Sequence, residues 1–119
     1  MSPLADAIYN VLYRLVPTAD DPRITRAELS KRIRADGCHI DGKSTKVAEA
    51  LTEIAQLCLE QGIPVLPAIV VKAVKGRAEL PEVWYFHLVH PHATTDDERR
   101  EAWEAEMQKV KRTSYPFLL

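Results

Sequence analysis

The sequence predicts an α+β winged helix-turn-helix fold, made of three helices, a β-hairpin wing and a C-terminal helix. Three successive segments before residue 63 carry apolar residues at helical spacing. Two segments rich in β-branched and aromatic residues follow, 65–71 and 83–89. A last segment with helical spacing begins near residue 95. The order helix, helix, helix, strand, strand, helix is typical of a winged helix.

The first two helices are predicted from spacing and capping residues. Residues 4–16 carry apolar side chains three and four positions apart, and Pro17 closes that helix. Thr25 and Glu28 form a T-x-x-E capping box for a short second helix, which ends at Asp36–Gly37.

The third helix is the longest, and we expect Ser44 or Thr45 to be its N-cap. Gly62 supplies the C-terminal stop, and Pro64 follows it. The second and third helices, joined by a tight polar turn, would form a helix-turn-helix whose second helix enters the major groove of DNA by its N-terminal end. The buried stripe of this helix is predicted to contain Val47, Leu51, Ile54 and Cys58.

The wing is predicted from two strands. Residues 65–71 should form a mostly buried strand, with Pro67 near its start or on an edge. Residues 83–89 alternate between two faces and form the second strand, and residues 72–81 make a long tip between them.

The last segment, 95–119, is predicted to be a helix followed by an apolar tail. Thr94 or Thr95 caps the helix, and an acidic first turn suits the positive end of the helix dipole. We expect all 119 residues to form a single domain, because the chain is 46% hydrophobic and 28% charged.

The composition argues against a strongly basic nucleic-acid binder, a membrane or secreted protein, and a disulfide-rich protein. The net charge is −1, so no overall basic field marks the chain as a nucleic-acid binder. No basic leader precedes an apolar stretch, and no apolar run approaches the ~20 residues that span a bilayer. We therefore expect a cytoplasmic protein. Its two cysteines are too few for a disulfide framework, so Cys58 should be buried and Cys38 a free thiol in a loop.

Two runs, Ile24–Ser30 and Gly62–Val71, resemble small uncharacterised winged-helix proteins of bacteria and their mobile elements. In those proteins a proline-containing strand that ends in two valines follows the third helix, and a Trp-containing C-terminal helix ends near an aromatic-Pro pair. Trp103 and Tyr115–Pro116 match that ending. The resemblance covers about Ile24 to Pro116, and it implies the fold rather than a function.

The same segment is distantly similar to the C-terminal domain of alkylguanine-DNA alkyltransferases. In that family a similar helix pair leads to a Pro-Cys-His-Arg strand. Here Pro64 is followed by Val65-Leu66-Pro67, so the nucleophilic cysteine and its neighbouring histidine are both absent. Alkyl transfer is therefore not expected, whereas a shared mode of contacting DNA stays open.

A local basic segment favours double-stranded DNA as the partner. Residues 23–46 hold seven Lys or Arg against three Asp or Glu, although the whole chain is acidic by one charge. The third helix should contact DNA by its first turn only, because Glu49 and Glu53 further along would face phosphates. The predicted DNA-binding residues are Arg26, Lys31, Lys43, Ser44, Thr45, Lys46, Lys75 and Arg77.

The alternative function is a protein-binding module, such as a phage or mobile-element inhibitor, that acts through the hairpin and the C-terminal helix. The apolar tail 117–119 and the aromatic residues Tyr85 and Tyr115 fit a partner surface. A homodimer through the C-terminal helix is also conceivable, but no heptad pattern supports it.

No residue pattern predicts an enzyme, a metal site or a cofactor. His87 and His90 would point to opposite faces of a strand, and Pro91 stiffens the path to His92. Cys38 and His39 are adjacent, but neighbouring side chains in a turn rarely face each other. We therefore expect a non-enzymatic binding protein.

Overall fold

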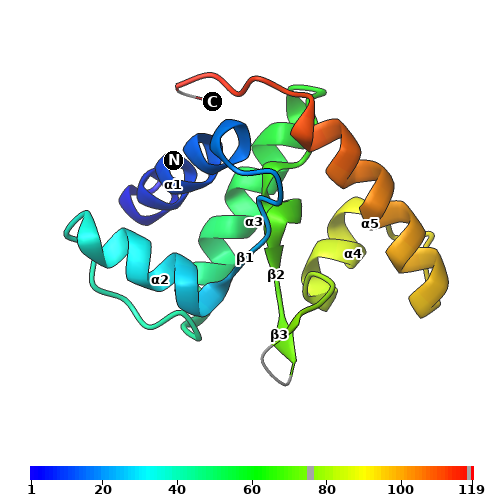
Figure 1. Cartoon of the computed structure of the whole chain (residues 1–119), viewed down its shortest axis with the longest axis horizontal. Helices are drawn as coiled ribbons and strands as arrows, with labels where there is room; N and C mark the ends of the chain where they lie inside the picture. The colour runs from blue at the N-terminus through cyan, green and yellow to red at the C-terminus, as the bar shows by residue number, and fades with distance from the viewer. Residues whose placement is uncertain (75–76, 118) are drawn as a thin grey trace.

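The computed structural model describes residues 1–74, 77–117 and 119, with the backbone alone for residues 77 and 78 (Figure 1). Helices make up most of this described chain: α1 (Pro3–Thr18), α2 (Arg26–Ala35), α3 (Thr45–Glu60), α4 (Val83–Val89), α5 (Asp96–Lys111) and the 3₁₀ helix η1 (Leu66–Ile69). Its strands have two residues each: β1 (Ile24–Thr25), β2 (Val70–Val71), β3 (Ala73–Val74) and β4 (Arg77–Ala78).

The predicted winged-helix fold is wrong, because the two segments expected to pair as a wing do not form a hairpin. The second of them is helix α4. The first is mainly η1, and its last two residues, β2, pair in parallel with β1. The only antiparallel pair among the described residues, β3 with β4, lies inside the segment predicted as the hairpin tip.

Segment 83–89 was predicted to be a strand because aromatic and β-branched residues, which favour strands, make up most of it. Its buried residues are in fact the neighbours Tyr85 and Phe86, while Val83 and His87 are exposed. That pattern suits one face of a short helix and not a period of two. Tertiary burial of the aromatic pair has overridden the strand propensity of the residues.

Segment 65–71 is buried at every position, and such a run does not distinguish a buried strand from a buried helix. Pro67 has no N–H to donate to a ladder and sits near the start of η1, where that lack costs least. The connection between α2 and α3, residues 36–44, is also longer than the roughly three- or four-residue turn of a helix-turn-helix.

The four predicted helices are confirmed, but α1 continues to Thr18 with Pro17 inside it. The capping box predicted for α2 is only half formed, since Thr25 accepts the N–H of Glu28 and no return bond from Glu28 is made among the described residues. Thr25, Ser44 and Thr95 are the N-caps of α2, α3 and α5, and each accepts a backbone N–H with its side chain. Gly37 and Gly62 end α2 and α3 at positive φ, where an L side chain would be strained. In both places a 6→1 and a 5→2 backbone hydrogen bond complete a Schellman motif.

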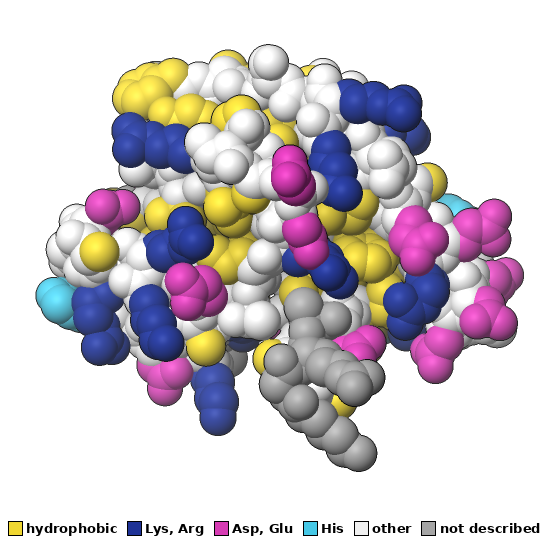
Figure 2. Space-filling model, in the orientation of Figure 1, with side chains coloured by type: hydrophobic (Ala, Val, Ile, Leu, Met, Phe, Trp, Pro, Cys, Tyr) yellow, Lys and Arg dark blue, Asp and Glu magenta, His cyan; other side chains and the backbone are white. Residues whose placement is uncertain are grey.

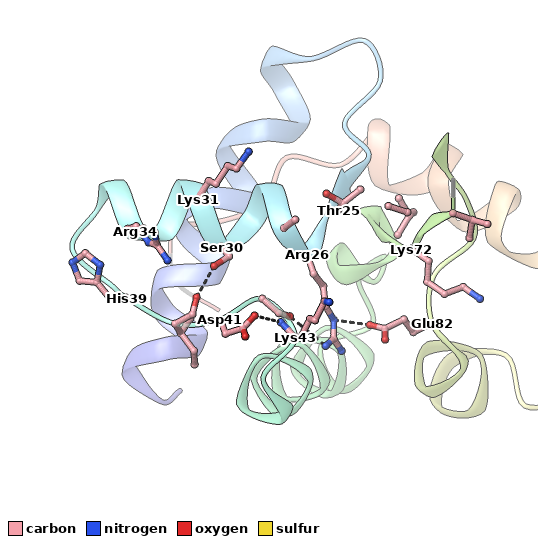
Figure 3. A pocket seen from close by; sticks show the side chains of 16 residues that line it. Thr25, Arg26, Ser30, Lys31, Arg34, His39, Asp41, Lys43, Lys72 and Glu82 are labelled. Carbon is pink, nitrogen blue, oxygen red and sulfur yellow. Dashed lines mark hydrogen bonds and ion pairs between the residues drawn. The ribbon is translucent and has the colours of Figure 1, made fainter. Parts of the chain in front are cut away.

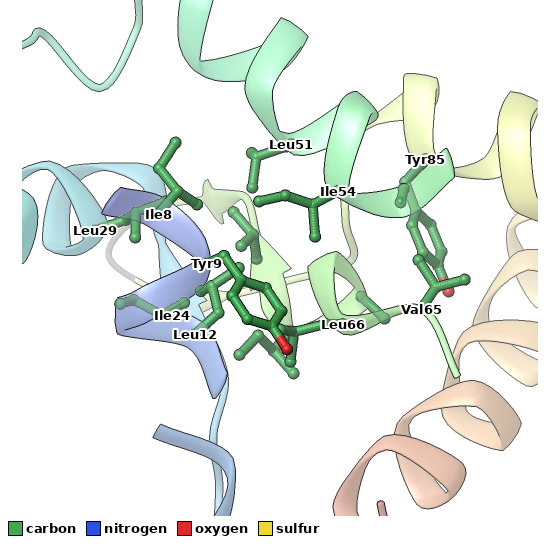
Figure 4. Close-up of a cluster of buried hydrophobic side chains, with 14 of the residues drawn as sticks. Ile8, Tyr9, Leu12, Ile24, Leu29, Leu51, Ile54, Val65, Leu66 and Tyr85 are labelled. Carbon is green, nitrogen blue, oxygen red and sulfur yellow. The ribbon is translucent and has the colours of Figure 1, made fainter. Parts of the chain in front are cut away.

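The core lies where α1, α2, α3 and η1 meet, and α4 and α5 pack on the other side of η1 (Figures 1 and 4). Leu12, Ile54 and Leu66 come from three of these elements and are fully buried. Cys58 is buried as predicted. Burial raises the pKa of its thiol, so this cysteine behaves as an apolar core residue.

The C-terminal tail returns to α1 and α3 instead of projecting away (Figure 1). The Tyr115 hydroxyl donates to the carbonyl of Pro64 at 2.7 Å, and the Tyr9 hydroxyl donates to the carbonyl of Pro116. Gln61 donates to the carbonyl of Leu119 at 2.7 Å. The polar groups of the tail are therefore largely used within the molecule.

No helix in the described ranges has the length and apolar character needed to cross a membrane.

His90 is a buried histidine between α4 and α5. Its Nε2 lies 3.0 Å from the hydroxyl of Tyr85, which is fully buried. Burial lowers the pKa of His90, nearby His92 and Lys109 lower it further, and Glu106 opposes them. The folded state therefore favours the neutral imidazole.

Because the pKa of His90 is lower in the folded protein, its contribution to stability is complete above the unfolded pKa of about 6.5 and is lost as the pH falls through the folded value. We expect the free energy of unfolding to decrease between pH 7.5 and pH 5, measured by urea titration. His90→Gln should reduce this pH dependence, and His87→Gln, at an exposed histidine on α4, should preserve it. An unchanged pH dependence in His90→Gln would contradict the assignment.

Candidate nucleic-acid interface

A groove of about 820 Å³ follows the length of α2 (Figure 3). One wall is the connection 39–43, and the other is formed by residues 71–74. Glu82, the N-cap of α4, closes one end of the groove. The groove is therefore built by segments far apart in the sequence.

Helix α2 supplies one face of the groove. Ala27, Lys31 and Arg34 occupy positions i, i+4 and i+7, and all three line it. The face is held in place because Leu29 and Ile33, on the opposite side of the helix, are fully buried. The buried stripe therefore determines which cations point outward.

The 36–44 connection is shaped by its own polar groups. The Asp41 carboxylate accepts the backbone N–H of Lys43 at 2.9 Å, and the Asp41 carbonyl accepts that of Ser44 at 2.9 Å. The Ser30 hydroxyl donates to the carbonyl of Ile40 and fastens the connection to α2. These bonds place Lys43 at the groove and Ser44 at the start of α3.

Gly42 allows this close approach. A Cβ atom at position 42 would lie 2.7 Å from the backbone oxygen of Arg26 and 3.3 Å from the Cβ of Ser30. Any side chain at this position would therefore collide with the first turns of α2.

The cations of the groove exceed its carboxylates, five against two. Four of the five are exposed, and none of these four forms an ion pair with any described residue. They are Lys31, Arg34, Lys43 and Lys72. In Figure 2 blue side chains gather over α2, while magenta ones gather over the start of α5. The near-zero net charge thus conceals two surfaces of opposite sign.

The fifth cation, Arg26, is half-buried and already has a partner. Its Nε lies 2.6 Å from Oε1 of Glu82, and its Nη1 donates a long hydrogen bond of 3.4 Å to the carbonyl of Gly42. Figure 3 shows both side chains directed into the groove. Arg26 therefore links α2 to the start of α4.

The groove brings together Arg26, Lys31 and Lys43 of the predicted DNA-binding residues. Lys46 and Thr45 are exposed at the adjoining start of α3, whereas the Ser44 hydroxyl accepts the N–H of Lys46 at 3.2 Å as a cap. Lys75 and the side chain of Arg77 lie outside the described residues.

The basic residues and the histidine of the lining that were missing from the predicted set are Arg34, Lys72 and His39. Helical spacing could have found Arg34, because it lies one turn from Lys31 on the same face of α2. His39 and Lys72 reach the groove through tertiary folding, and no local pattern points to them.

Of the histidines and cysteines considered above as catalytic or metal-binding residues, only His39 lines this groove. The ring of His90 is held by Tyr85, and His87 is exposed on α4. Cys38 is partly buried and packs against the core. In the described ranges no three His, Cys, Asp or Glu residues are grouped so that they could hold a metal ion.

Comparisons with protein-family models, curated proteins and solved structures give no match to this chain. The groove itself is therefore the basis for a functional conclusion.

Proposed function

We propose that this protein binds double-stranded DNA without catalysing a reaction, and that phosphates of the duplex lie along the α2 groove. The observation that carries the proposal is the set of four exposed cations around one groove, with no ion-pair partner among the described residues. Phosphate contacts supply most of the non-specific affinity of proteins for DNA, and they need cations in this accessible state.

The dimensions of the groove suit a nucleic-acid backbone. Helix α2 has ten residues and is therefore about 15 Å long. One strand of a duplex places a phosphate about every 3.4 Å along its axis, so several phosphates span that length. Lys31 and Arg34 lie on the helix, and Lys43 and Lys72 lie on the two walls. The cations are thus spread over the helix and both walls rather than concentrated at one point.

The lining favours a duplex over a single strand. Proteins that bind single strands without sequence preference stack the bases on aromatic side chains. Apart from the imidazole of His39, the described lining holds no aromatic ring, and its apolar residues are small or aliphatic. Contact with the outside of a duplex requires no stacking surface.

The protein-binding alternative has weaker support. The tail that was expected to offer an apolar surface is hydrogen-bonded to Tyr9 of α1, to Gln61 at the end of α3 and to Pro64. Phe117, which is 68% exposed, still contacts the ring of Tyr13 edge to face. The remaining exposed apolar residues on the described surface are few, and small scattered apolar groups are normal on any protein.

The first test is binding of a random-sequence duplex at two salt concentrations. Four phosphate contacts predict a loss of affinity of about 150-fold between roughly 50 and roughly 200 mM salt. We expect micromolar or tighter binding at the lower concentration, measured by fluorescence anisotropy. Absence of binding at low salt would overturn the proposal.

The double variant Lys31→Ala, Lys43→Ala is expected to weaken duplex binding by about tenfold and to reduce the salt slope by about 2, because two phosphate contacts are removed. The matched control is Lys109→Ala, Lys111→Ala, which removes the same charge from exposed positions on α5. Equal losses in the two double variants would show that net charge, not the groove, governs the binding.

A further inference from the structure

Glu82 is an anion inside a groove that otherwise collects cations. Its side chain is 35% exposed, and that of Arg26 is 19% exposed. Glu82 is also the N-cap of α4, yet its carboxylate makes no capping hydrogen bond to that helix. The carboxylate is instead directed at Arg26 across the groove (Figure 3).

The Arg26–Glu82 pair is close but poorly oriented. The Nε–H of Arg26 is buried and makes no hydrogen bond with any described residue, although the carboxylate oxygen lies 2.6 Å from the nitrogen. The one hydrogen bond of the guanidinium is the long contact from Nη1 to Gly42. A guanidinium binds a carboxylate or a phosphate best through two parallel N–H donors, and this pair does not have that arrangement.

We propose that Glu82 occupies a phosphate site on Arg26, and that an incoming phosphate group displaces it. A phosphate carries several acceptor oxygens and can engage two N–H donors of Arg26 at once. Because Glu82 is partly exposed, its carboxylate can turn into solvent, where water replaces Arg26 as its partner. The inference rests on the proposed function, since it takes phosphate to be the ligand of the groove.

Displacement has two consequences for binding. Arg26 becomes a fifth phosphate ligand, next to the four cations that are already exposed. A phosphate must also break the Arg26–Glu82 pair before it reaches Arg26, so the free energy of that pair is subtracted from the binding of the phosphate. Glu82 therefore lowers the affinity of the groove for phosphate. It also prevents weakly binding monovalent anions from occupying Arg26.

The test compares Glu82→Gln with Glu79→Gln. Both variants remove one negative charge from the segment before α4, but Glu79 faces Arg100, 4.0 Å away, and does not line the groove. We expect Glu82→Gln to tighten duplex binding about fivefold and Glu79→Gln to change it about twofold or less. In an Arg26→Ala background, the effect of Glu82→Gln should shrink to that of Glu79→Gln.

Inorganic tripolyphosphate serves as a second probe, measured by calorimetry on the same five proteins: the wild type, Glu82→Gln, Glu79→Gln, Arg26→Ala and the double variant Arg26→Ala, Glu82→Gln. If the wild type binds no duplex, the proposed function fails, and tripolyphosphate still decides this inference. The inference is supported, with either probe, if Glu82→Gln binds more tightly than Glu79→Gln and this gain disappears in the Arg26→Ala background. Equal binding by the two glutamine variants, or a gain that persists without Arg26, overturns it.

Thermal unfolding shows whether Glu82→Gln retains the fold. Should it unfold, Glu82→Asp takes its place, because aspartate is a favoured N-cap and its shorter side chain withdraws the charge from Arg26. A gain in affinity of about twofold over Glu79→Gln is then expected. No gain would overturn the inference.

Discussion

Trp103→Ala is expected to lower the free energy of unfolding by about 3–5 kcal/mol. The indole is 6% exposed, and its Nε1 donates to the carbonyl of Ala68 at 2.8 Å. This one side chain joins α5 to η1, which lies between the two halves of the molecule (Figure 1). Truncation would leave a large cavity and an unpaired buried carbonyl at the same time.

Urea denaturation followed by circular dichroism measures the effect. Trp103→Phe separates its two causes: it retains much of the apolar area and loses only the hydrogen bond, so a loss of about 1–3 kcal/mol is expected. Leu59→Ala is a surface control, because Leu59 is 43% exposed on α3, and its cost should stay within about 0.5 kcal/mol. A loss below about 1 kcal/mol for Trp103→Ala would mean that α5 does not depend on this contact.

Helices were the predictable part of this fold because their signals are local. Thr25, Ser44 and Thr95 each cap a helix through a backbone N–H two or three residues ahead. Gly37 and Gly62 end α2 and α3 through bonds that span six residues. A sequence pattern contains all of this information, since no distant partner is involved.

The strand predictions were wrong because the contacts that decide the conformation of these segments are not local in the sequence. Segment 65–71 is apolar throughout, so only its neighbours decide between a strand and a 3₁₀ helix. Those neighbours include Trp103, whose indole N–H donates to the carbonyl of Ala68, and Glu106, whose carboxylate accepts the N–H of Val65 at 2.8 Å. With such partners the backbone of this segment does not need a hairpin to satisfy its polar groups.

The residues of the candidate site also divide into those that a local sequence pattern predicts and those that only the folded structure brings together. Lys31 and Lys43 were found from a local count of charge, and both line the groove. Glu82 was not found, because its relation to Arg26 exists only after folding has brought the start of α4 to the first turn of α2. A count of charged residues in the sequence also treats Arg26 and Lys31 alike. In the structure Arg26 is half-buried and paired with Glu82, whereas Lys31 is exposed.

Gly42→Val is expected to destabilise the protein by about 3 kcal/mol and to weaken duplex binding in the molecules that remain folded. The Cβ would lie 2.7 Å from the backbone oxygen of Arg26, and the backbone of α2 cannot yield as a flexible side chain could. The clash is relieved only if the 39–43 wall moves away from α2. Lys43 would move with that wall.

Gly37→Ala is the matched control, because it changes a glycine in the same connection without a collision. A Cβ at position 37 meets no atom within 4 Å, although φ is +93°. Its cost is therefore backbone strain of about 1–2 kcal/mol, and the groove should retain its geometry. Unfolding by urea gives the stability of each variant, and anisotropy below the transition gives its affinity for the duplex.

The pair of glycine variants separates two explanations of any loss in binding. If stability alone governs affinity, Gly37→Ala and Gly42→Val lose binding in proportion to their loss of stability. If the position of the 39–43 wall governs it, Gly42→Val loses binding at a temperature where both proteins are folded, and Gly37→Ala does not. Wild-type stability and affinity in Gly42→Val would show that the wall does not pack on α2 as the contacts of Gly42 require.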